Sequence, residues 1–144
     1  MIIRSVFNSH EKIPVKYTPD GKDVNPAIDI LDVPENTKSF VLIIDDPDAP
    51  AGDWVHWIVY NIPSNIRRIE ENSVPAQARL GMNDAKMLKY HGPSPPYGVH
   101  RYFFKLYALD NFLELAEGAK KQDILKAITG HLIAKTELIG VYGR

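Results

Sequence analysis

The amino-acid sequence predicts a mainly β protein, a β-sandwich with a helical segment near its C-terminus. Strand-like runs bounded by proline, glycine and asparagine dominate residues 2–109, and only residues 121–134 have apolar side chains at helical spacing. The chain has 144 residues, of which 44% are hydrophobic and 24% charged, the balance of an ordinary globular protein. Because no repeat, low-complexity tract or linker interrupts it, we expect a single domain over residues 1–144.

Composition narrows the class of protein further. The absence of cysteine excludes a disulfide scaffold, a thiolate nucleophile and a cysteine-type zinc site. A net charge of −1 gives no electrostatic basis for binding nucleic acid or an anionic membrane surface. No stretch approaches the ~20 apolar residues of a membrane-spanning helix, and Met1–Phe7 is too short for a secretory signal. We therefore expect a cytoplasmic protein that does not insert into membranes.

The N-terminal third is predicted to form short strands at the edge of a sheet. Ile2–Phe7 has a strand pattern, and Ile13–Tyr17 is predicted as an edge strand because it contains Pro14, which lacks a backbone donor. Thr18–Lys22 is a turn in which proline sets φ and glycine accepts a positive φ. Ala27–Val33 is predicted as another short strand.

Three longer strands are predicted next, and we expect them to form the centre of the sheet. These are Ser39–Asp45, Trp54–Ile62 and Val99–Leu109. In the second, alternation assigns one face to Trp54, His56, Ile58, Tyr60 and Ile62, and the opposite face to Val55, Trp57, Val59 and Asn61. Both faces are largely apolar, so this strand is predicted to be central and covered on both sides.

The C-terminal part is predicted to contain the helical structure. Leu113–Glu117 is predicted as a single turn, and Lys121–Ala134 as a helix with Asp123 near its start. Glu137–Tyr142 is predicted as a final strand. The segment Ile66–Gly81 has no clear pattern, and Asn83–Leu88 is predicted as no more than a short element.

An acidic, proline-stiffened loop follows the first long strand, with the sequence Asp45-Asp46-Pro47-Asp48-Ala49-Pro50. Proline fixes φ and removes a backbone donor, so the strand must end there and the loop must be stiff. Such a loop at the mouth of a sheet could hold a ligand. It could equally be a strand-ending turn with solvated carboxylates.

Polar residues in two other predicted strands indicate a site near this acidic loop. His56 lies within an apolar strand, and His100 and Tyr102 follow the Gly/Pro-rich loop Tyr90–Gly98. Buried polar groups need partners, so neighbouring strands would gather one cluster, composed of Asp46, Asp48, His56, His100 and Tyr102. The alternatives are a core histidine with its hydrogen bonds satisfied and a tyrosine that only packs in the sheet.

Three motifs in this order resemble the phosphatidylethanolamine-binding protein family. They are Asp46-Pro47-Asp48-Ala49-Pro50, then Trp54-Val55-His56-Trp57, then Gly92-Pro93-Ser94-Pro95-Pro96 with His100-Arg101-Tyr102. Their spacing, and the lack of a long C-terminal helical extension, resemble the bacterial and archaeal branch of Raf-kinase-inhibitor-like proteins. The motifs cover residues 40–109, and the length fits over nearly the whole chain.

The resemblance implies a large central sheet packed on a smaller one, with one or two short helices near the C-terminus. It also implies a pocket that accepts phosphate, phosphorylethanolamine-like head groups or carboxylates. By position in the motifs, the ligand-binding residues would be Asp46, Pro50, His56, Gly92, Pro95, Pro96, His100 and Tyr102. Asp48 belongs to the motif and would have a supporting role. Arg101 would also have a supporting role, because alternation turns it away from His100 and Tyr102, and it would pair with a carboxylate. Tyr142 is not a safe counterpart of the C-terminal tyrosine of eukaryotic members.

The residues themselves are consistent with an anion pocket. Two imidazoles, one of them protonated beside Asp46, the Tyr102 hydroxyl and backbone N–H groups of residues 92–98 could all meet an anion. We therefore expect a small-anion binding protein with a regulatory or inhibitory role, no catalytic residue, no metal and no cofactor.

Two other functions stay open. Family members inhibit serine proteases or kinases, so a protein-interaction inhibitor is one alternative. A hydrolase that uses Asp46, His56 and His100 as a metal site or acid–base pair is the other, although no nucleophile or HExxH spacing supports it. By analogy with prokaryotic relatives, we also expect a homodimer.

Overall fold

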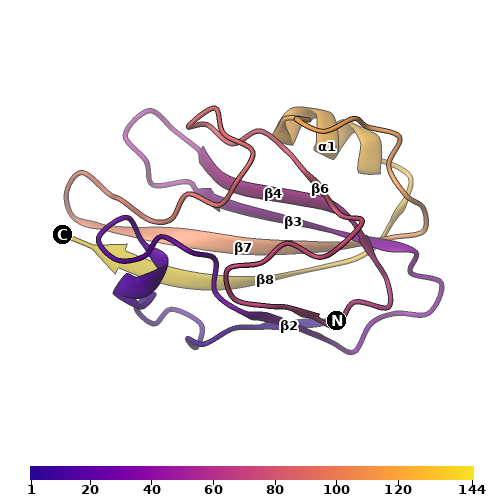
Figure 1. Ribbon diagram of the computed structural model, residues 1–144, viewed down its shortest axis with the longest axis horizontal. Coiled ribbons are helices and arrows are strands. Elements are labelled where there is room, and N and C mark those ends of the chain that lie inside the picture. Colours follow the sequence, from indigo (N-terminus) through magenta and orange to yellow (C-terminus); the bar gives the residue numbers. More distant parts are fainter.

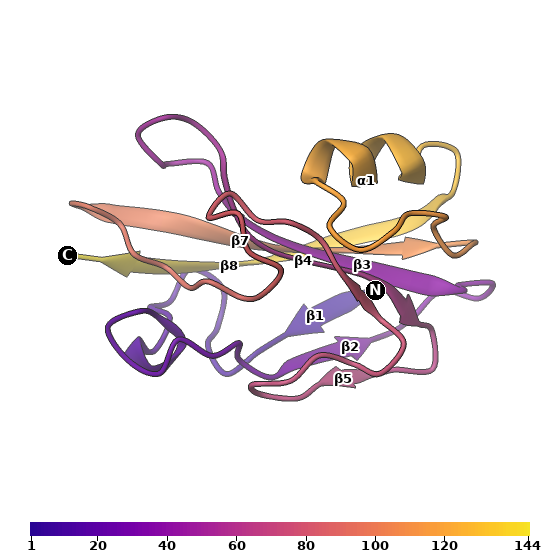
Figure 2. The same cartoon turned by 45° about the horizontal axis from the view of Figure 1, so that its top comes forward.

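The computed structural model describes residues 1–144 and contains two antiparallel sheets. The large sheet has the strand order β6-β4-β3-β7-β8, and the small sheet has the order β1-β2-β5. Figures 1 and 2 show the small sheet beneath the large one, with a single α-helix on the opposite face. The predicted fold, two packed sheets with a short helix near the C-terminus, is confirmed.

The strand bounds place the longest strands at the centre of the molecule. In the small sheet, β1 is Ile2–Arg4, β2 is Ile28–Leu31 and β5 is Arg68–Ile69. In the large sheet, the strands are β3 (Ser39–Asp46), β4 (Trp54–Pro63), β6 (Arg79–Leu80), β7 (Val99–Leu109) and β8 (Leu132–Gly143). The helices are η1, a 3₁₀ turn at Val15–Tyr17, and α1 at Lys121–Ile128. None of them is both long enough and apolar enough to cross a membrane.

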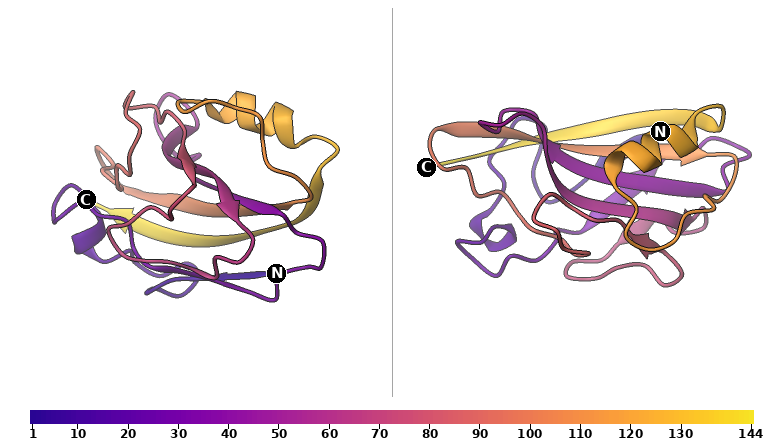
Figure 3. Two further views of the ribbon diagram at one scale, coloured as in Figure 1. Left: turned by 45° about the vertical axis from the view of Figure 1, so that its right-hand side comes forward. Right: turned by 90° about the horizontal axis from the view of Figure 1, so that it is seen from above.

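The large sheet is buried on both faces. Every residue of β3 is buried. Between the sheets, one apolar cluster includes Ile44, Trp57 and Phe104. Helix α1 lies over the other face of the large sheet (Figure 3). Under it, a second cluster includes Ile43 and Ile58 with the helix residues Ile124 and Ile128. The prediction that Trp54–Ile62 forms a central strand is confirmed, since β4 lies between β6 and β3.

The predicted alternation along β4 is wrong beyond His56, because the strand contains two bulges. Asp45 pairs with Val55 and Ile44 pairs with Trp57, so His56 is an extra residue with no opposite partner. A second irregularity lies at Asn61, which has a positive φ of 54°. Trp57 therefore packs between the sheets, whereas Ile58 and Tyr60 face α1.

The predicted C-terminal helix is too long by six residues. It ends at Ile128, and Gly130 follows with φ +85°, a left-handed conformation typical of a helix end. Leu132 and Ile133 belong instead to β8, which is longer than the strand predicted at Glu137–Tyr142. Leu113–Glu117 is not a helical turn but irregular backbone.

Two further predictions in the N-terminal region are corrected. The first strand ends at Arg4 rather than Phe7. The predicted edge strand Ile13–Tyr17 is instead a 3₁₀ turn preceded by a short pairing with β8. In that pairing, the N–H groups of His10 and Ile13 donate to the carbonyls of Ile139 and Val141. Pro14 leaves no donor to continue it.

Candidate functional site

A cavity of ≈ 280 Å³ lies where β3 ends and where β4 and β7 begin. Antiparallel pairing brings these strand ends together: Asp46 pairs with Trp54, and Asp45 pairs with Phe103. The cavity is lined by seven of the eight residues predicted as ligand-binding, namely Asp46, Pro50, His56, Pro95, Pro96, His100 and Tyr102. Four of the five residues of the cluster predicted from the polar strand positions therefore lie together, and Asp48 is the one outside the cavity.

Asp46 and His100 form a buried pair in the wall of the cavity. Oδ2 of Asp46 lies 2.7 Å from Nδ1 of His100, and the two side chains are only 4% and 8% exposed. Oδ1 of Asp46 accepts a second hydrogen bond of 2.7 Å from the backbone N–H of Asp48. Since Nδ1 of His100 donates to the carboxylate, its Nε2 is the ring nitrogen left for a ligand, and it has no partner in the protein.

His56 is oriented by the loop on the other side of the cavity. Its Nδ1 lies 2.6 Å from the carbonyl oxygen of His91, so Nδ1 carries the hydrogen. Burial lowers the pKa of His56, outweighing the opposite effects of the His91 carbonyl and Asp46. His56 is therefore neutral near pH 7, and its Nε2 is an acceptor. The expectation of a cationic imidazole does not hold for this residue.

Tyr102 has an unsatisfied hydroxyl at the cavity. The side chain is 1% exposed, and its hydroxyl has no hydrogen-bond partner in the protein. Burial, with the negative charge of Asp46, raises the pKa of Tyr102, so the hydroxyl keeps its proton. The ring lies edge-on to His56, with ring centroids 5.3 Å apart. A buried hydroxyl without a partner in the protein can donate a hydrogen bond to a bound ligand.

Asp48 and Arg101 pair with each other and do not line the cavity, as expected for Arg101 from alternation along its strand. The guanidinium of Arg101 donates twice to Asp48, from Nε at 2.9 Å and Nη2 at 2.9 Å, and its backbone N–H donates at 3.0 Å. This pairing lowers the pKa of Asp48 to about 2. The pair ties the acidic loop to the start of β7 and does not enter the cavity.

Gly92 is the exception among the predicted residues, because it lies outside the cavity. Its N–H donates to Oδ1 of Asp23 at 2.8 Å, and a Cβ at this position would lie 2.1 Å from the carbonyl oxygen of Tyr17. Its role is the close approach of two backbone segments. Tyr142 also lies outside, with its hydroxyl bonded to Asp20 at 2.8 Å.

Four further residues line the cavity without having been predicted: Ala49, Trp54, His91 and Ser94. All four lie within or beside the motifs, so proximity in sequence was the available signal. Arg144 supports this wall, since Nη2 donates to Oγ of Ser94 at 3.1 Å and Nε donates to the carbonyl of Pro95 at 2.9 Å. Nothing in the sequence indicated that contact between residues 50 positions apart.

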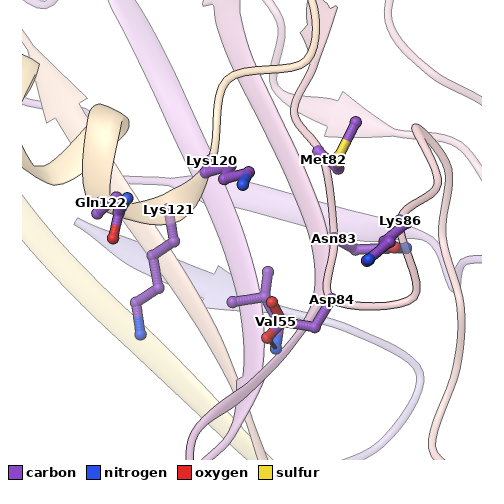
Figure 4. A pocket seen from close by; sticks show the side chains of 8 residues that line it. All are labelled: Val55, Met82, Asn83, Asp84, Lys86, Lys120, Lys121 and Gln122. Atoms are coloured by element: carbon purple, nitrogen blue, oxygen red, sulfur yellow. Dashed lines mark hydrogen bonds between the residues drawn. The ribbon is translucent and has the colours of Figure 1, made fainter.

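A second depression, of ≈ 370 Å³, lies on the other face of the sheet beside the start of α1 (Figure 4). Lys86 and Lys120 lie at its margins, but Lys121 turns away from it toward Asp45 and Asp53. Asp84 uses one oxygen to accept from the N–H of Val55. No buried group without a partner faces this depression, so it is the weaker candidate.

The cavity does not have the ligand set of a metal site. No group of three or more His, Asp or Glu side chains in the structure is arranged to hold a metal ion. Asp46 and His100 are bonded to each other, and His56 uses Nδ1 for a carbonyl. The free ring nitrogens and the Tyr102 hydroxyl are instead suited to hydrogen bonding.

Comparisons with known proteins agree with the fold and the motifs. The profile of the family described as phosphatidylethanolamine-binding protein matches residues 4–143. A "UPF0098 protein" of Methanothermobacter thermautotrophicus is 49% identical over 96% of this chain and 95% of its own length. One of Aquifex aeolicus is 48% identical over 96% of this chain and 85% of its own.

Solved structures show the same relationship. The phosphatidylethanolamine-binding protein homologue CT736 of Chlamydia trachomatis superimposes with a TM-score of 0.95 at 40% identity, covering 99% of this chain and 96% of its own. YbcL of Escherichia coli gives a TM-score of 0.91 at 27% identity, covering 99% and 97%. The chain therefore belongs to the phosphatidylethanolamine-binding protein family, in its bacterial and archaeal branch.

Proposed function

We propose that this protein binds a small anion, a phosphate monoester or a carboxylate, in the cavity between β3, β4 and β7. One observation carries the proposal: the buried hydroxyl of Tyr102 has no partner in the protein, and Tyr102 lines the cavity together with His56 and His100. An anionic oxygen would satisfy that hydroxyl at no cost to any existing hydrogen bond.

The remaining groups favour a phosphate monoester. His100 can present Nε2–H to an anionic oxygen while Asp46 holds Nδ1. Neutral His56 presents an acceptor, which a hydroxyl of a monohydrogen phosphate would match. An attached ammonium group, as in phosphorylethanolamine, could lie against the half-exposed ring of Trp54 at the mouth.

The side chains that line the cavity support binding rather than catalysis. The only hydroxyl of the cavity besides Tyr102 is that of Ser94, whose oxygen accepts from Arg144 and is not bonded to a histidine. A serine nucleophile needs an adjacent base. We therefore assign no catalytic residue. A regulatory role would require the loaded cavity to alter a surface, and exposed Tyr97 and Val99 lie in the loop and strand beside it.

Titration with inorganic phosphate, phosphorylethanolamine and acetate tests the proposal, with His56 and His100 followed by NMR and affinity measured by calorimetry. Tyr102→Phe should weaken phosphate binding without destabilising the free protein, because the hydroxyl it removes has no partner. Tyr90→Phe is the matched control. Its hydroxyl donates to the carbonyl of Tyr17 at 2.7 Å, so this variant should lose about 1 kcal/mol of stability and keep its affinity.

The proposal fails if no imidazole signal moves at millimolar phosphate or acetate. It also fails if Tyr102→Phe binds phosphate as tightly as the wild type. Metal analysis of the purified protein is an independent check on the hydrolase alternative, which stoichiometric zinc or iron would favour.

A further inference from the structure

Another cavity, of ≈ 350 Å³, lies where the β4–β6 side of the large sheet meets the loops that flank β2 and β5. This volume is in the range of small-molecule sites in proteins. The cavity shares no lining residue with the one between β3, β4 and β7. Because Trp57 lies in its wall, we call it the indole cavity. Its wall also includes Val24, Val74, Leu80, Lys89 and Tyr90.

The indole N–H of Trp57 is a buried donor without a partner. The side chain is 1% exposed, and Nε1 forms no hydrogen bond in the protein. The Trp57 ring lies edge-on to Tyr90, with ring centroids 5.6 Å apart, but the Tyr90 hydroxyl donates to the carbonyl of Tyr17 at 2.7 Å. An indole nitrogen donates and does not accept, so a ligand that stabilises this group must carry a hydrogen-bond acceptor.

The unpaired charge of the indole cavity is positive. Lys89 is exposed and forms no ion pair in the protein. The other ionised wall residue, Asp23, is used by the neighbouring loop: Oδ1 accepts from the N–H of Gly92 at 2.8 Å, and Oδ2 lies 3.5 Å from Nδ1 of His91. An ammonium favours a charged acceptor over a neutral one. One free cation matches one negative charge, so a carboxylate fits better than a phosphate dianion.

The rest of the wall offers apolar surface to a ligand. Val24 and Leu80 are half-buried, and Val74 is exposed. Together with the rings of Trp57 and Tyr90, these side chains would lose contact with water when an apolar group enters the cavity. The matching ligand therefore carries an apolar body beside its carboxylate.

The outer wall is held in place by Asn25, which is buried. Its Nδ2 donates to the carbonyl of Glu70 at 3.0 Å, and its Oδ1 accepts from the N–H of Ser73 at 3.1 Å. Its backbone carbonyl accepts from the N–H of Asn72 at 3.0 Å. These bonds fix the segment that carries Val74 before any ligand binds, which lowers the ordering cost of binding.

We propose that the indole cavity is a second binding site, for a small monocarboxylate with an aliphatic or aromatic body. The carboxylate accepts from Nε1 of Trp57 and pairs with Lys89, while the apolar body packs against Tyr90 and the aliphatic wall. The bulge in β4 allows two sites on one strand. His56, the extra residue, lines the first cavity, and the next residue, Trp57, lines the second.

The two tryptophans of the chain give separate reporters, because Trp54 lines the first cavity and Trp57 the second. Titration of the ¹⁵N-labelled protein with benzoate should move the indole N–H signal of Trp57, which Trp54→Phe identifies as the signal that remains. Benzamide has the same shape and an acceptor but no charge, and it should bind about tenfold more weakly.

Lys89→Gln should weaken benzoate binding by about tenfold and leave the fold unchanged, because Lys89 is exposed. Lys86→Gln is the matched control: this lysine is also exposed but lies outside the indole cavity, so benzoate affinity should stay the same. Trp57→Phe, which keeps an aromatic ring and removes the N–H, should also weaken benzoate binding. Thermal unfolding checks that each variant is folded.

A Trp57 signal that does not move at millimolar benzoate overturns the proposal, and would mean that the N–H is bonded to the face of the Tyr90 ring. Equal affinities for benzoate and benzamide, or full benzoate affinity in Lys89→Gln, overturn it as well. So does displacement of benzoate by saturating inorganic phosphate, which would place benzoate in the first cavity. Binding of phosphate itself is measured separately at His56 and His100, so either site can fail without the other.

Discussion

The carboxylate of Asp46 accepts a hydrogen bond from the His100 imidazole at 2.7 Å in an almost fully buried position, and from the N–H of Asp48 at the same distance. A single side chain thus fixes both the acidic loop and one imidazole of the cavity. Because both bonds end on a carboxylate, each is stronger than a bond between neutral groups.

Asp46→Asn should therefore destabilise the protein by about 2 kcal/mol. Each carboxylate oxygen of Asp46 accepts one hydrogen bond, whereas an asparagine has only one acceptor oxygen and its NH₂ group cannot accept the other. Urea unfolding measures the change. Asp29→Asn is the control, because the Asp29–Arg68 pair is nearly half exposed and its loss should destabilise the protein much less. Equal losses in the two variants would contradict the structural role of Asp46.

Stability should fall as the pH is lowered, in part because of His56. Its folded-state pKa is below the unfolded value of about 6.5, since burial disfavours the imidazolium. Between those two values the unfolded chain binds the proton and the folded chain does not, so stability is full above about pH 6.5 and declines below it. His56→Asn should flatten this dependence in unfolding experiments between about pH 8 and pH 5. Parallel profiles for variant and wild type would show that His56 is not the group responsible.

Gly92 and Gly98 should respond differently to alanine. At Gly92 a Cβ would meet the Tyr17 carbonyl at 2.1 Å, so Gly92→Ala should cost about 2–3 kcal/mol and weaken phosphate binding as the loop shifts. At Gly98 a Cβ has open space, and only the positive φ of 71° opposes it, so about 1 kcal/mol is expected. Thermal unfolding of both variants checks the order. The reverse order would mean that the loop does not pack as described.

The Arg101–Asp48 contact should be detectable from the pKa of the Asp48 carboxyl group. Its two parallel hydrogen bonds hold the pKa of Asp48 at about 2, and lysine cannot form both. Arg101→Lys should raise the pKa of Asp48 toward its ordinary value, as measured by carboxyl NMR titration. The stability loss should be small, because half of the Arg101 side chain is exposed and solvent screens the pair. An unchanged pKa would exclude the bidentate pair in solution.

The long strands and the site could be predicted from sequence because they depend on strong local signals. β3, β4 and β7 are apolar runs bounded by proline-rich loops, and the predicted and observed bounds of β7 are the same. The site follows from those strand ends, since antiparallel neighbours must bring Asp46 and His100 to one edge. The motifs then indicated Pro50, Pro95 and Pro96 as walls.

What could not be predicted depends on tertiary contacts. β5 and β6 have two residues each, too few for any periodicity. Leu132 and Ile133 fit a helical pattern, and only the pairing of Leu132 and Ala134 with β7 shows that this segment is a strand. Gly92 belongs to the motif, but its position outside the cavity follows from a contact with Tyr17, distant in sequence. Arg144 reaches Ser94 for the same reason.

His56 is the extra residue of a bulge in β4, so the pairing of the large sheet does not depend on it. Residues 55 and 57 already pair with Asp45 and Ile44, so a strand without residue 56 could keep the same ladder. The imidazole of His56 therefore sits on an insertion that the sheet itself does not require. Deleting residue 56 would remove this imidazole and leave Val55 and Trp57 paired with Asp45 and Ile44.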